Sequence, residues 1–229
     1  EEQYIDWAAK FDFGNISIIG GEPLLHPGLF SYVKGLRKLW PNTPMIITSN
    51  GLQINKVKSL YEYCVANNCG VEISFHDKDD LDIRLWEEIE KFKQSNGRSW
   101  GPIETEIVHH VGRDGEKFTT ESRHLQDAGG FRFLFTDAHF FASTSVKEYD
   151  GMIPMPHNSD PEKAYHDCSL KFSHTFFDGE LYKCGMIAAG KEFIKERGAE
   201  VHWQKLFDYK PVSMKQYNPN WRQSFFAAE

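Results

Sequence analysis

The sequence predicts an α/β protein in which strands and helices alternate over roughly the first 140 of its 229 residues. Short β-branched runs such as Asn15 to Ile19 are followed by stretches with apolar residues three and four positions apart, the spacing of a helical face. Glycine, proline and asparagine interrupt the pattern between these stretches. Strands that alternate with helices in this way form a parallel sheet, open or rolled into a barrel, with functional residues on the loops after the strands.

The elements follow in a regular order. We expect a short amphipathic helix, then a buried strand that stops at Gly20-Gly21, and a helix that Pro41 ends. A second strand, a loop at Ser49 to Gly51 and a helix repeat the unit, and a third strand leads to a further helix. The helical faces are expected within Ile5 to Phe11, Leu29 to Leu39, Ile54 to Cys64 and Leu85 to Phe92, and the later strands at Met45 to Thr48, Val71 to Phe75, Thr105 to Val111 and Phe131 to Phe135.

The pattern changes near His139, where Gly151 and several prolines interrupt any long period. We therefore expect an α/β domain over residues 1–138 and a small, loop-rich C-terminal extension over residues 139–229.

Composition excludes several classes of protein. Lys+Arg number 26 against 33 Asp+Glu, a net charge of −7, which disfavours nucleic acid as a partner. The longest apolar runs are a few residues, far short of the roughly 20 that span a bilayer, so we expect a soluble protein without a membrane partner. Four cysteines are too few for a disulfide scaffold of this length, which favours a reducing, cytoplasmic location.

The most informative motif is Gly20-Gly21-Glu22-Pro23, at the end of the first predicted strand, where α/β sheets bind ligands. Two glycines let the backbone approach a ligand closely and adopt conformations closed to other residues. Glu22 can accept hydrogen bonds from an ammonium group, whereas Pro23 offers only a carbonyl acceptor. The loop therefore suits a zwitterionic amino-acid group.

The segments Ile18 to Pro27 and Thr48 to Gly51 together resemble the radical S-adenosylmethionine enzymes. The resemblance covers roughly Glu1 to Asp137 and implies a partial (β/α)6 TIM-like barrel. It also implies that the loop from Gly20 to Pro23 binds the methionyl amino group of S-adenosylmethionine.

Three further residues are candidates for binding the same cofactor by this resemblance. Ser49 and Asn50 follow the second strand, and Ser74 lies at the end of the third. Asn50 has an equally good alternative explanation, because an Asn-Gly pair is what a plain turn after a strand requires.

By the same resemblance, the activity is reductive cleavage of S-adenosylmethionine at a 4Fe-4S cluster. The 5′-deoxyadenosyl radical would abstract hydrogen from a peptide, a protein or a small molecule, with an electron donor such as flavodoxin or ferredoxin. The family's CxxxCxxC cluster motif precedes the glycine loop, whereas no cysteine here precedes Cys64. Either the motif lies upstream of Glu1, or the protein is a binding scaffold that has lost the chemistry. Cys64 and Cys69 are expected to be buried thiols, and no catalytic residue is assigned.

Cys168 and Cys184 form a C-x10-G-x4-C pattern in the extension, and Asp178-Gly179 between them predicts a hairpin turn that brings the thiols together. The pattern resembles the start of SPASM or twitch extensions, which implies an auxiliary iron-sulfur cluster, although no cysteine follows Cys184. The alternative is a zinc clip on a non-catalytic scaffold, with its ligands drawn from His166, Cys168, His174 and Cys184.

Overall fold

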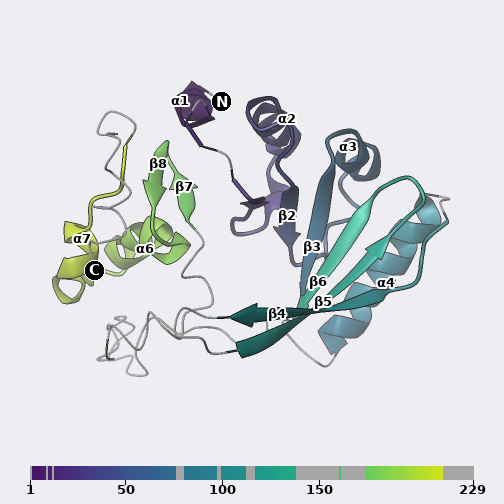
Figure 1. Cartoon of the computed structure of the whole chain (residues 1–229). Helices are drawn as coiled ribbons and strands as arrows, with labels where there is room; N and C mark the ends of the chain where they lie inside the picture. Colours follow the sequence, from purple (N-terminus) through teal and green to yellow (C-terminus); the bar gives the residue numbers. More distant parts are fainter. Residues whose placement is uncertain are drawn as a thin grey trace. The chain divides into compact units, whose positions relative to one another are not determined.

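The computed structural model describes residues 2–8, 10–11, 13–75, 80–96, 99–111, 117–137, 160 and 174–213 (Figure 1). The chain divides into two compact units, which we call the sheet unit and the hairpin unit. The sheet unit comprises residues 8–141 with residue 1, and the hairpin unit comprises residues 142–229 with Glu2–Trp7.

The sheet unit is mixed α/β and contains a six-stranded, mostly parallel sheet. The strands are parallel in β1–β2, β2–β3 and β3–β6, whereas β5 is antiparallel to both β6 and β4. No pairing in the described residues joins the edge strands β1 and β4, so a closed barrel is not present there. In spatial order the strands are β1 (Ile16–Ile18), β2 (Met45–Ser49), β3 (Cys69–Phe75), β6 (Arg132–Asp137), β5 (Lys117–Gln126) and β4 (Glu104–Val111).

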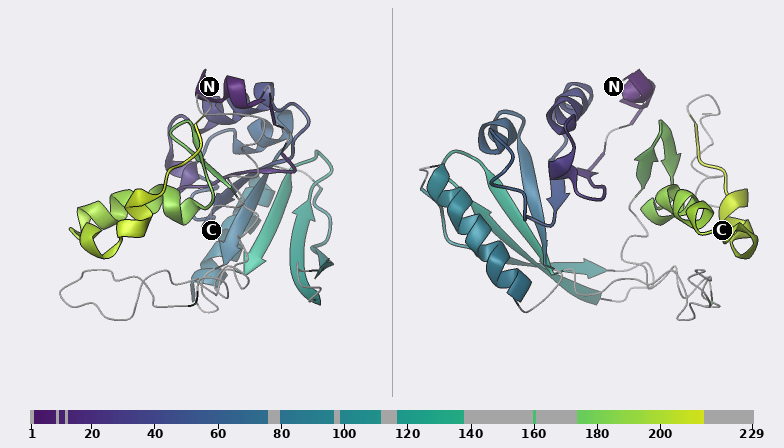
Figure 2. Two further views of the ribbon diagram at one scale, coloured as in Figure 1. Left: turned by 60° about the vertical axis from the view of Figure 1, so that its left-hand side comes forward. Right: turned by 180° about the vertical axis from the view of Figure 1, so that it is seen from behind.

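Three helices lie along one face of this sheet, as two views from different sides show (Figures 1 and 2). They are α2 (Leu29–Leu39), α3 (Leu60–Ala66) and α4 (Asp80–Ser95). The helix expected from Ile54 begins only at Leu60, because residues 51–59 form turns. Ile54 is nevertheless fully buried, so its apolar character was read correctly but its secondary structure was not.

The sequence did not predict β5. We expected β4 to be one more strand of the alternating pattern, but it forms an antiparallel hairpin with β5, in which Glu104 pairs with His124. The segment Lys117–Gln126 reads KFTTESRHLQ and has no regular apolar alternation. Among the side chains described, Ser122 to Gln126, Leu125 is the buried one.

Aromatic side chains from β6 and α4 form the centre of the core. The Phe133 ring is fully buried, and its centroid lies 4.9 Å from that of Phe131, 5.5 Å from Phe92 and 5.8 Å from Trp100. Phe75, Trp86 and Phe135 extend this cluster, with ring centroids 5.1–6.0 Å apart. Such tightly packed rings hold α4 against β3 and β6.

Arg37 joins the ends of two helices. Its guanidinium group donates hydrogen bonds to carbonyl oxygens that follow α2 and α3, at 2.8–3.2 Å. Carbonyl groups at helix C-terminal ends lack partners within the helix, and a cationic donor is favourable there. The acceptors are Trp40, Pro41, Thr43, Asn67 and Asn68.

The hairpin unit contains β7 (Thr175–Phe177) and β8 (Glu180–Tyr182), which are antiparallel. Asp178 and Gly179 connect them with φ values of 50° and 79°, as a type I′ turn requires, and this confirms the predicted hairpin turn. In the described residues after β8 lie α6 (Gly185–Glu196), η2 (Glu200–His202) and α7 (Gln204–Asp208).

The first helix, α1 (Glu2–Ala8), packs on this hairpin. Trp7 Nε1 donates to the Gly179 carbonyl at 3.1 Å, and the Phe176 ring lies 5.6 Å from that of Tyr4 and 5.2 Å from that of Trp7. The sequence pattern had placed this helix with the α/β domain. Its apolar side chains contact instead a hairpin more than 160 residues further along the chain.

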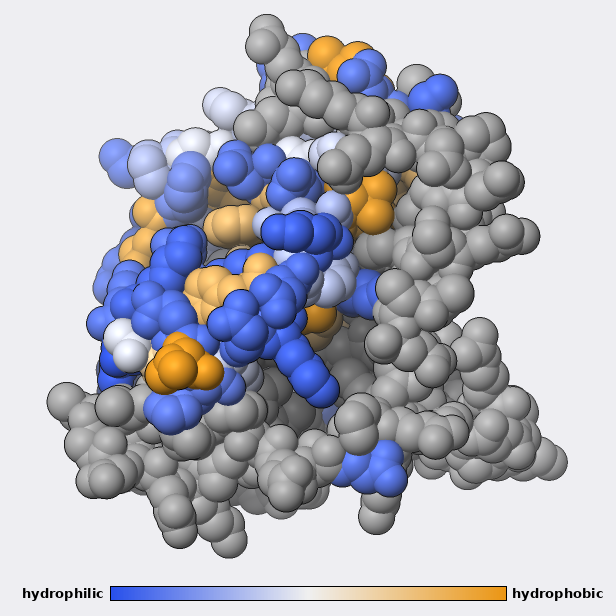
Figure 3. Space-filling model, turned by 90° about the vertical axis from the view of Figure 1, so that its left-hand side faces the viewer, coloured by the Kyte–Doolittle hydropathy of each residue, from blue (hydrophilic) through white to orange (hydrophobic). Residues whose placement is uncertain are grey.

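No helix in the described ranges is long and apolar enough to cross a membrane. On the face of the molecule in Figure 3, the hydrophobic residues among those coloured form small groups separated by hydrophilic ones.

Candidate ligand-binding site

The loop after β1 meets the loop after β2 at the C-terminal edge of the parallel strands, where the Glu22 carboxylate joins them. One carboxylate oxygen, Oε1, accepts hydrogen bonds from the Leu24 N–H at 3.0 Å and from the Ser49 hydroxyl at 2.8 Å. The other, Oε2, accepts from the Asn50 N–H at 3.0 Å. Glu22 therefore holds the two loops in register, and its side chain contacts protein groups.

The local sequence explains this conformation. Glu22 is the N-cap of the short 3-10 helix η1 (Pro23–Leu25), with proline at its first position, where a missing N–H costs nothing. Pro23 is buried, and its carbonyl already accepts from the His26 N–H at 3.0 Å. Pro23 therefore has a structural role, because it begins the η1 turn. Its role in binding a ligand stays a prediction.

Gly20 and Gly21 are exposed, and neither has a positive φ. The expectation that they adopt conformations closed to other residues is therefore wrong. A Cβ atom at either position would meet no other atom within 4 Å, so the described protein itself does not require glycine there. Gly51 is different, because its φ is 77° and a Cβ would lie 2.4 Å from Leu85 Cδ1.

The two residues after β2 are oriented by local hydrogen bonds. The Ser49 hydroxyl is buried; it donates to Glu22 and accepts from the Gly51 N–H at 2.9 Å. Asn50 is exposed, and its Oδ1 accepts from the Leu52 N–H at 3.0 Å, which is the turn role that its sequence also suggested. The structure thus brings Glu22, Ser49 and Asn50 together.

A second polar group, which the sequence reasoning missed, lies on the face of the sheet away from the helices. Thr48 Oγ1 donates to Glu72 Oε2 at 2.8 Å, and Thr136 Oγ1 donates to Glu72 Oε1 at 2.6 Å. Ser74, two residues further along β3, pairs in register with Thr136 and shares this face. The available signal was Val71-Glu72-Ile73-Ser74, in which polar residues alternate with buried apolar ones.

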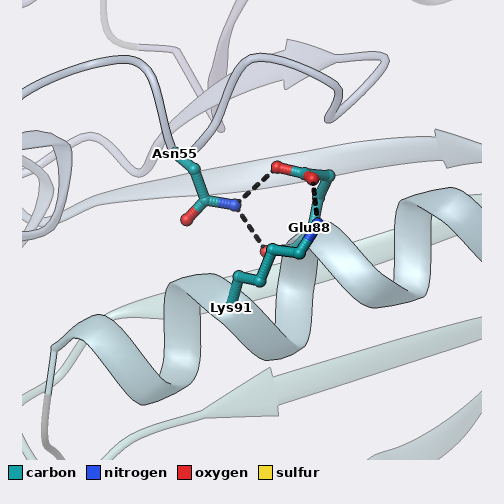
Figure 4. Close-up of polar contacts among 3 residues, drawn as sticks. All are labelled: Asn55, Glu88 and Lys91. Atoms are coloured by element: carbon teal, nitrogen blue, oxygen red, sulfur yellow. Dashed lines mark hydrogen bonds and ion pairs between the residues drawn. The ribbon is translucent and has the colours of Figure 1, made fainter.

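The loop after β2 is anchored to α4 on the opposite side (Figure 4). Asn55 Nδ2 donates to the main-chain carbonyl and to the carboxylate of Glu88, both at 2.8 Å. Hydrogen bonds from Lys91 and Asn55 hold the pKa of Glu88 below its ordinary value. This clamp fixes the base of the loop that carries Ser49 and Asn50.

The described cysteines do not fit an iron-sulfur cluster beside this site. Cys64 and Cys69 are buried between α3 and β3 as free thiols, as the sequence predicted. The hydrogen bond with Cys69, together with burial, holds the pKa of Cys64 well above its ordinary value, which keeps it a neutral thiol. No group of three or more His, Cys, Asp or Glu side chains in the described ranges could hold a metal ion.

The predicted metal site of the extension is only partly described. Cys184 is half-buried, and its carbonyl accepts from Ile187 and Ala188 at the start of α6. His174 is exposed, with Nδ1 3.4 Å from the Lys183 carbonyl oxygen. Cys168 and His166 lie outside the described residues, so the auxiliary cluster and the zinc clip both stay predictions.

No protein-family model matches the chain, and neither a curated protein nor a solved structure matches it. Function has to be argued from the residues and their geometry.

Proposed function

We propose that the C-terminal edge of β1, β2 and β3 binds the amino-acid part of S-adenosylmethionine, within a radical S-adenosylmethionine enzyme. The main support is the pair Gly20-Gly21, whose exposed backbone has free space above it and whose glycines no described contact or φ value explains. A ligand that approaches the main chain closely accounts for both glycines. The proposal includes the finer fold, a partial (β/α)6 barrel.

Some of these residues contact the ligand in this proposal, and others hold the loop in position. The carbonyl groups of Gly20 and Gly21 are the acceptors for the ligand's ammonium group, because the Glu22 carboxylate is engaged by three protein donors. Glu22 and Ser49 are therefore positioning residues, which hold the glycine loop against the end of β2. The exposed Asn50 amide and the Ser74 hydroxyl are the groups for a ribose or carboxylate.

Radical cleavage of S-adenosylmethionine needs an electron from an iron-sulfur cluster. Because the described cysteines do not fit such a cluster, we derive no radical step from them, and these residues have the roles of binding and orienting the ligand. The electron donor, the peptide or small-molecule substrate, the auxiliary cluster at Cys168 and Cys184 and the cytoplasmic location belong to this proposal through the resemblance alone. A binding scaffold without catalysis is the second candidate.

Replacement of Gly21 by alanine tests the site without disturbing the fold. The added methyl group meets no protein atom within 4 Å, so the midpoint of thermal unfolding should not change. It should occupy the space of the ligand and weaken S-adenosylmethionine binding, measured by calorimetry, by at least about tenfold, equivalent to roughly 1.4 kcal/mol. Gly14→Ala is the matched control, since Gly14 is also exposed with free space around it.

Glu22→Ala should also weaken binding, but with a loss of stability because three hydrogen bonds disappear. Unchanged affinity in both Gly21→Ala and Glu22→Ala would refute the site. Binding that depends on Gly21, without 5′-deoxyadenosine formation by the anaerobically reconstituted protein, would instead favour the scaffold.

A further inference from the structure

We propose that Glu72, Thr48 and Thr136 form a binding site for a primary alkylammonium group, such as that of a lysine side chain. The site lies on the sheet face away from α2, α3 and α4. This inference adds a class of substrate, an amine, to the proposed function. Only the description of the amine as a substrate rests on that function; the binding of an amine at Glu72 does not.

This face of the sheet is polar and open. Parallel strands are normally buried on both faces. Here β1, β2, β3 and β6 are parallel, yet no helix in the described part of the sheet unit lies on the second face (Figure 2). Glu72 and Thr48 are half-buried and Thr136 is exposed, so these polar groups can be reached by a ligand.

The hydrogen bonds within the group all run toward Glu72. Both threonine hydroxyl groups donate to Glu72, one to each carboxylate oxygen. Their hydrogens are thereby used, and the lone pairs that remain on all three side chains are acceptors. A ligand that complements three acceptor groups on adjacent strands must be a donor, and an ammonium group supplies three donors and no acceptor.

The charge of Glu72 also favours a cationic ligand. Glu72 makes no ion pair with any described residue, whereas Glu104, on the same face, lies 3.1 Å from His124. Arg132 shares the face but donates from Nη2 to Asn68 Oδ1 at 3.2 Å. A half-buried carboxylate without a cationic partner favours a cationic ligand. Ca²⁺ is less well suited, because one carboxylate and two hydroxyl groups are fewer oxygen ligands than it takes.

A purely structural role for Glu72 makes a different prediction. Cross-strand side-chain pairs stabilise sheets, and Glu72 links β3 to both neighbouring strands. If that were its whole role, removal of its charge would change stability and leave amine binding unaffected. The two roles therefore separate when binding and stability are measured on the same variants.

The test uses the full chain and Nα-acetyl-lysine N-methylamide as the probe, titrated by calorimetry or NMR, with the uncharged norleucine analogue as the reference. We expect the lysine probe to bind more tightly than the norleucine and arginine analogues. Glu72→Gln should weaken lysine-probe binding by at least about tenfold, the size expected for a lost charge-assisted hydrogen bond. Glu104→Gln removes the same charge from a glutamate that already has a partner. It should change the affinity for the lysine probe by less than about twofold.

Equal losses of lysine-probe affinity in Glu72→Gln and Glu104→Gln would overturn the proposal. So would equal affinities for the lysine and norleucine probes. Tighter binding of the arginine analogue would overturn the ammonium assignment. If Glu72→Gln does not fold, Thr136→Val carries the test, because Thr136 is exposed and its loss should still weaken binding by about threefold.

The same variants separate this inference from the proposed function. Glu72→Gln should leave S-adenosylmethionine affinity unchanged, and Gly21→Ala should leave lysine-probe affinity unchanged. Loss of one binding event without the other therefore shows which of the two proposals has failed.

Discussion

The two faces of the same sheet have opposite characters, although adjacent residues of the same strands build them. Toward the helices lie Ile47, Val71, Ile73, Phe133 and Phe135, each 2% exposed or less. Toward the other side lie polar or partly exposed side chains, namely Thr48, Glu72, Ser74, Leu134 and Thr136. Strand periodicity makes this separation possible, because alternate residues face opposite sides. One face packs against the helices, and the hydrogen bonds of Thr48, Glu72 and Thr136 leave acceptor groups on the other.

The largest expected effect compares two neighbours in β6. Phe133→Ala removes a fully buried ring from the aromatic cluster and should lower the free energy of unfolding by about 3–5 kcal/mol. Leu134→Ala, on the other face, removes a half-buried side chain and should cost less than about 1.5 kcal/mol. Urea unfolding of both variants measures the difference, and equal losses would contradict the assignment of the two faces.

A smaller effect is expected when one hydrogen bond is deleted on each face. On the helix side, the Tyr61 hydroxyl donates to Asp127, whose other oxygen accepts from the Gly129 and Phe131 N–H groups. Tyr61→Phe leaves this buried carboxylate short of a donor and should cost about 1.5–3 kcal/mol.

On the open face, Thr136→Val deletes the bond to Glu72 at an exposed position, where water replaces the donor. We expect a loss of no more than about 0.5 kcal/mol. Chemical unfolding checks both variants, and a larger loss for Thr136→Val would mean that Glu72 is mainly a structural link.

The effect of the Asn55 clamp at the base of the β2 loop is also small, and it depends on pH. The folded-state pKa of Glu88 is lowered by Lys91 and Asn55, so the stability that these contacts contribute is fully present above the unfolded-state value, about 4.3. It is lost as the pH falls through the lower, folded-state value. Asn55→Ala should therefore cost less than about 1 kcal/mol at pH 7, with a smaller difference from wild type near pH 3.

Urea titrations of wild type and Asn55→Ala at the two pH values check this prediction. The exposed Asn42, on the turn after α2, offers a control in Asn42→Ala, whose effect should not vary with pH in the same direction. If Asn55→Ala lowers the free energy of unfolding equally at both pH values, the hydrogen bond to the main-chain carbonyl of Glu88 alone accounts for the clamp.

Particular residues show how far sequence reasoning reaches. The alternation of strands and helices, the buried thiols of Cys64 and Cys69 and the turn at Asp178-Gly179 were all predictable, because each depends on near neighbours in the chain. β5 was missed because its sequence, KFTTESRHLQ, has no regular apolar alternation. Glu22 was predicted to bind a ligand, which stays a prediction, and its carboxylate contacts protein donors 2, 27 and 28 positions away.

The sequence by itself determined the α/β class, the approximate order of the elements and the position of the glycine loop after the first strand. Local periodicity and backbone chemistry encode these features. Only the tertiary structure decided that Thr48, Glu72 and Thr136 form one acceptor cluster, since these residues come from three strands up to 88 positions apart that meet only when the sheet assembles. It also decided that α1 packs on the hairpin, because such a contact follows from which apolar surfaces are available in three dimensions and not from the order of residues along the chain.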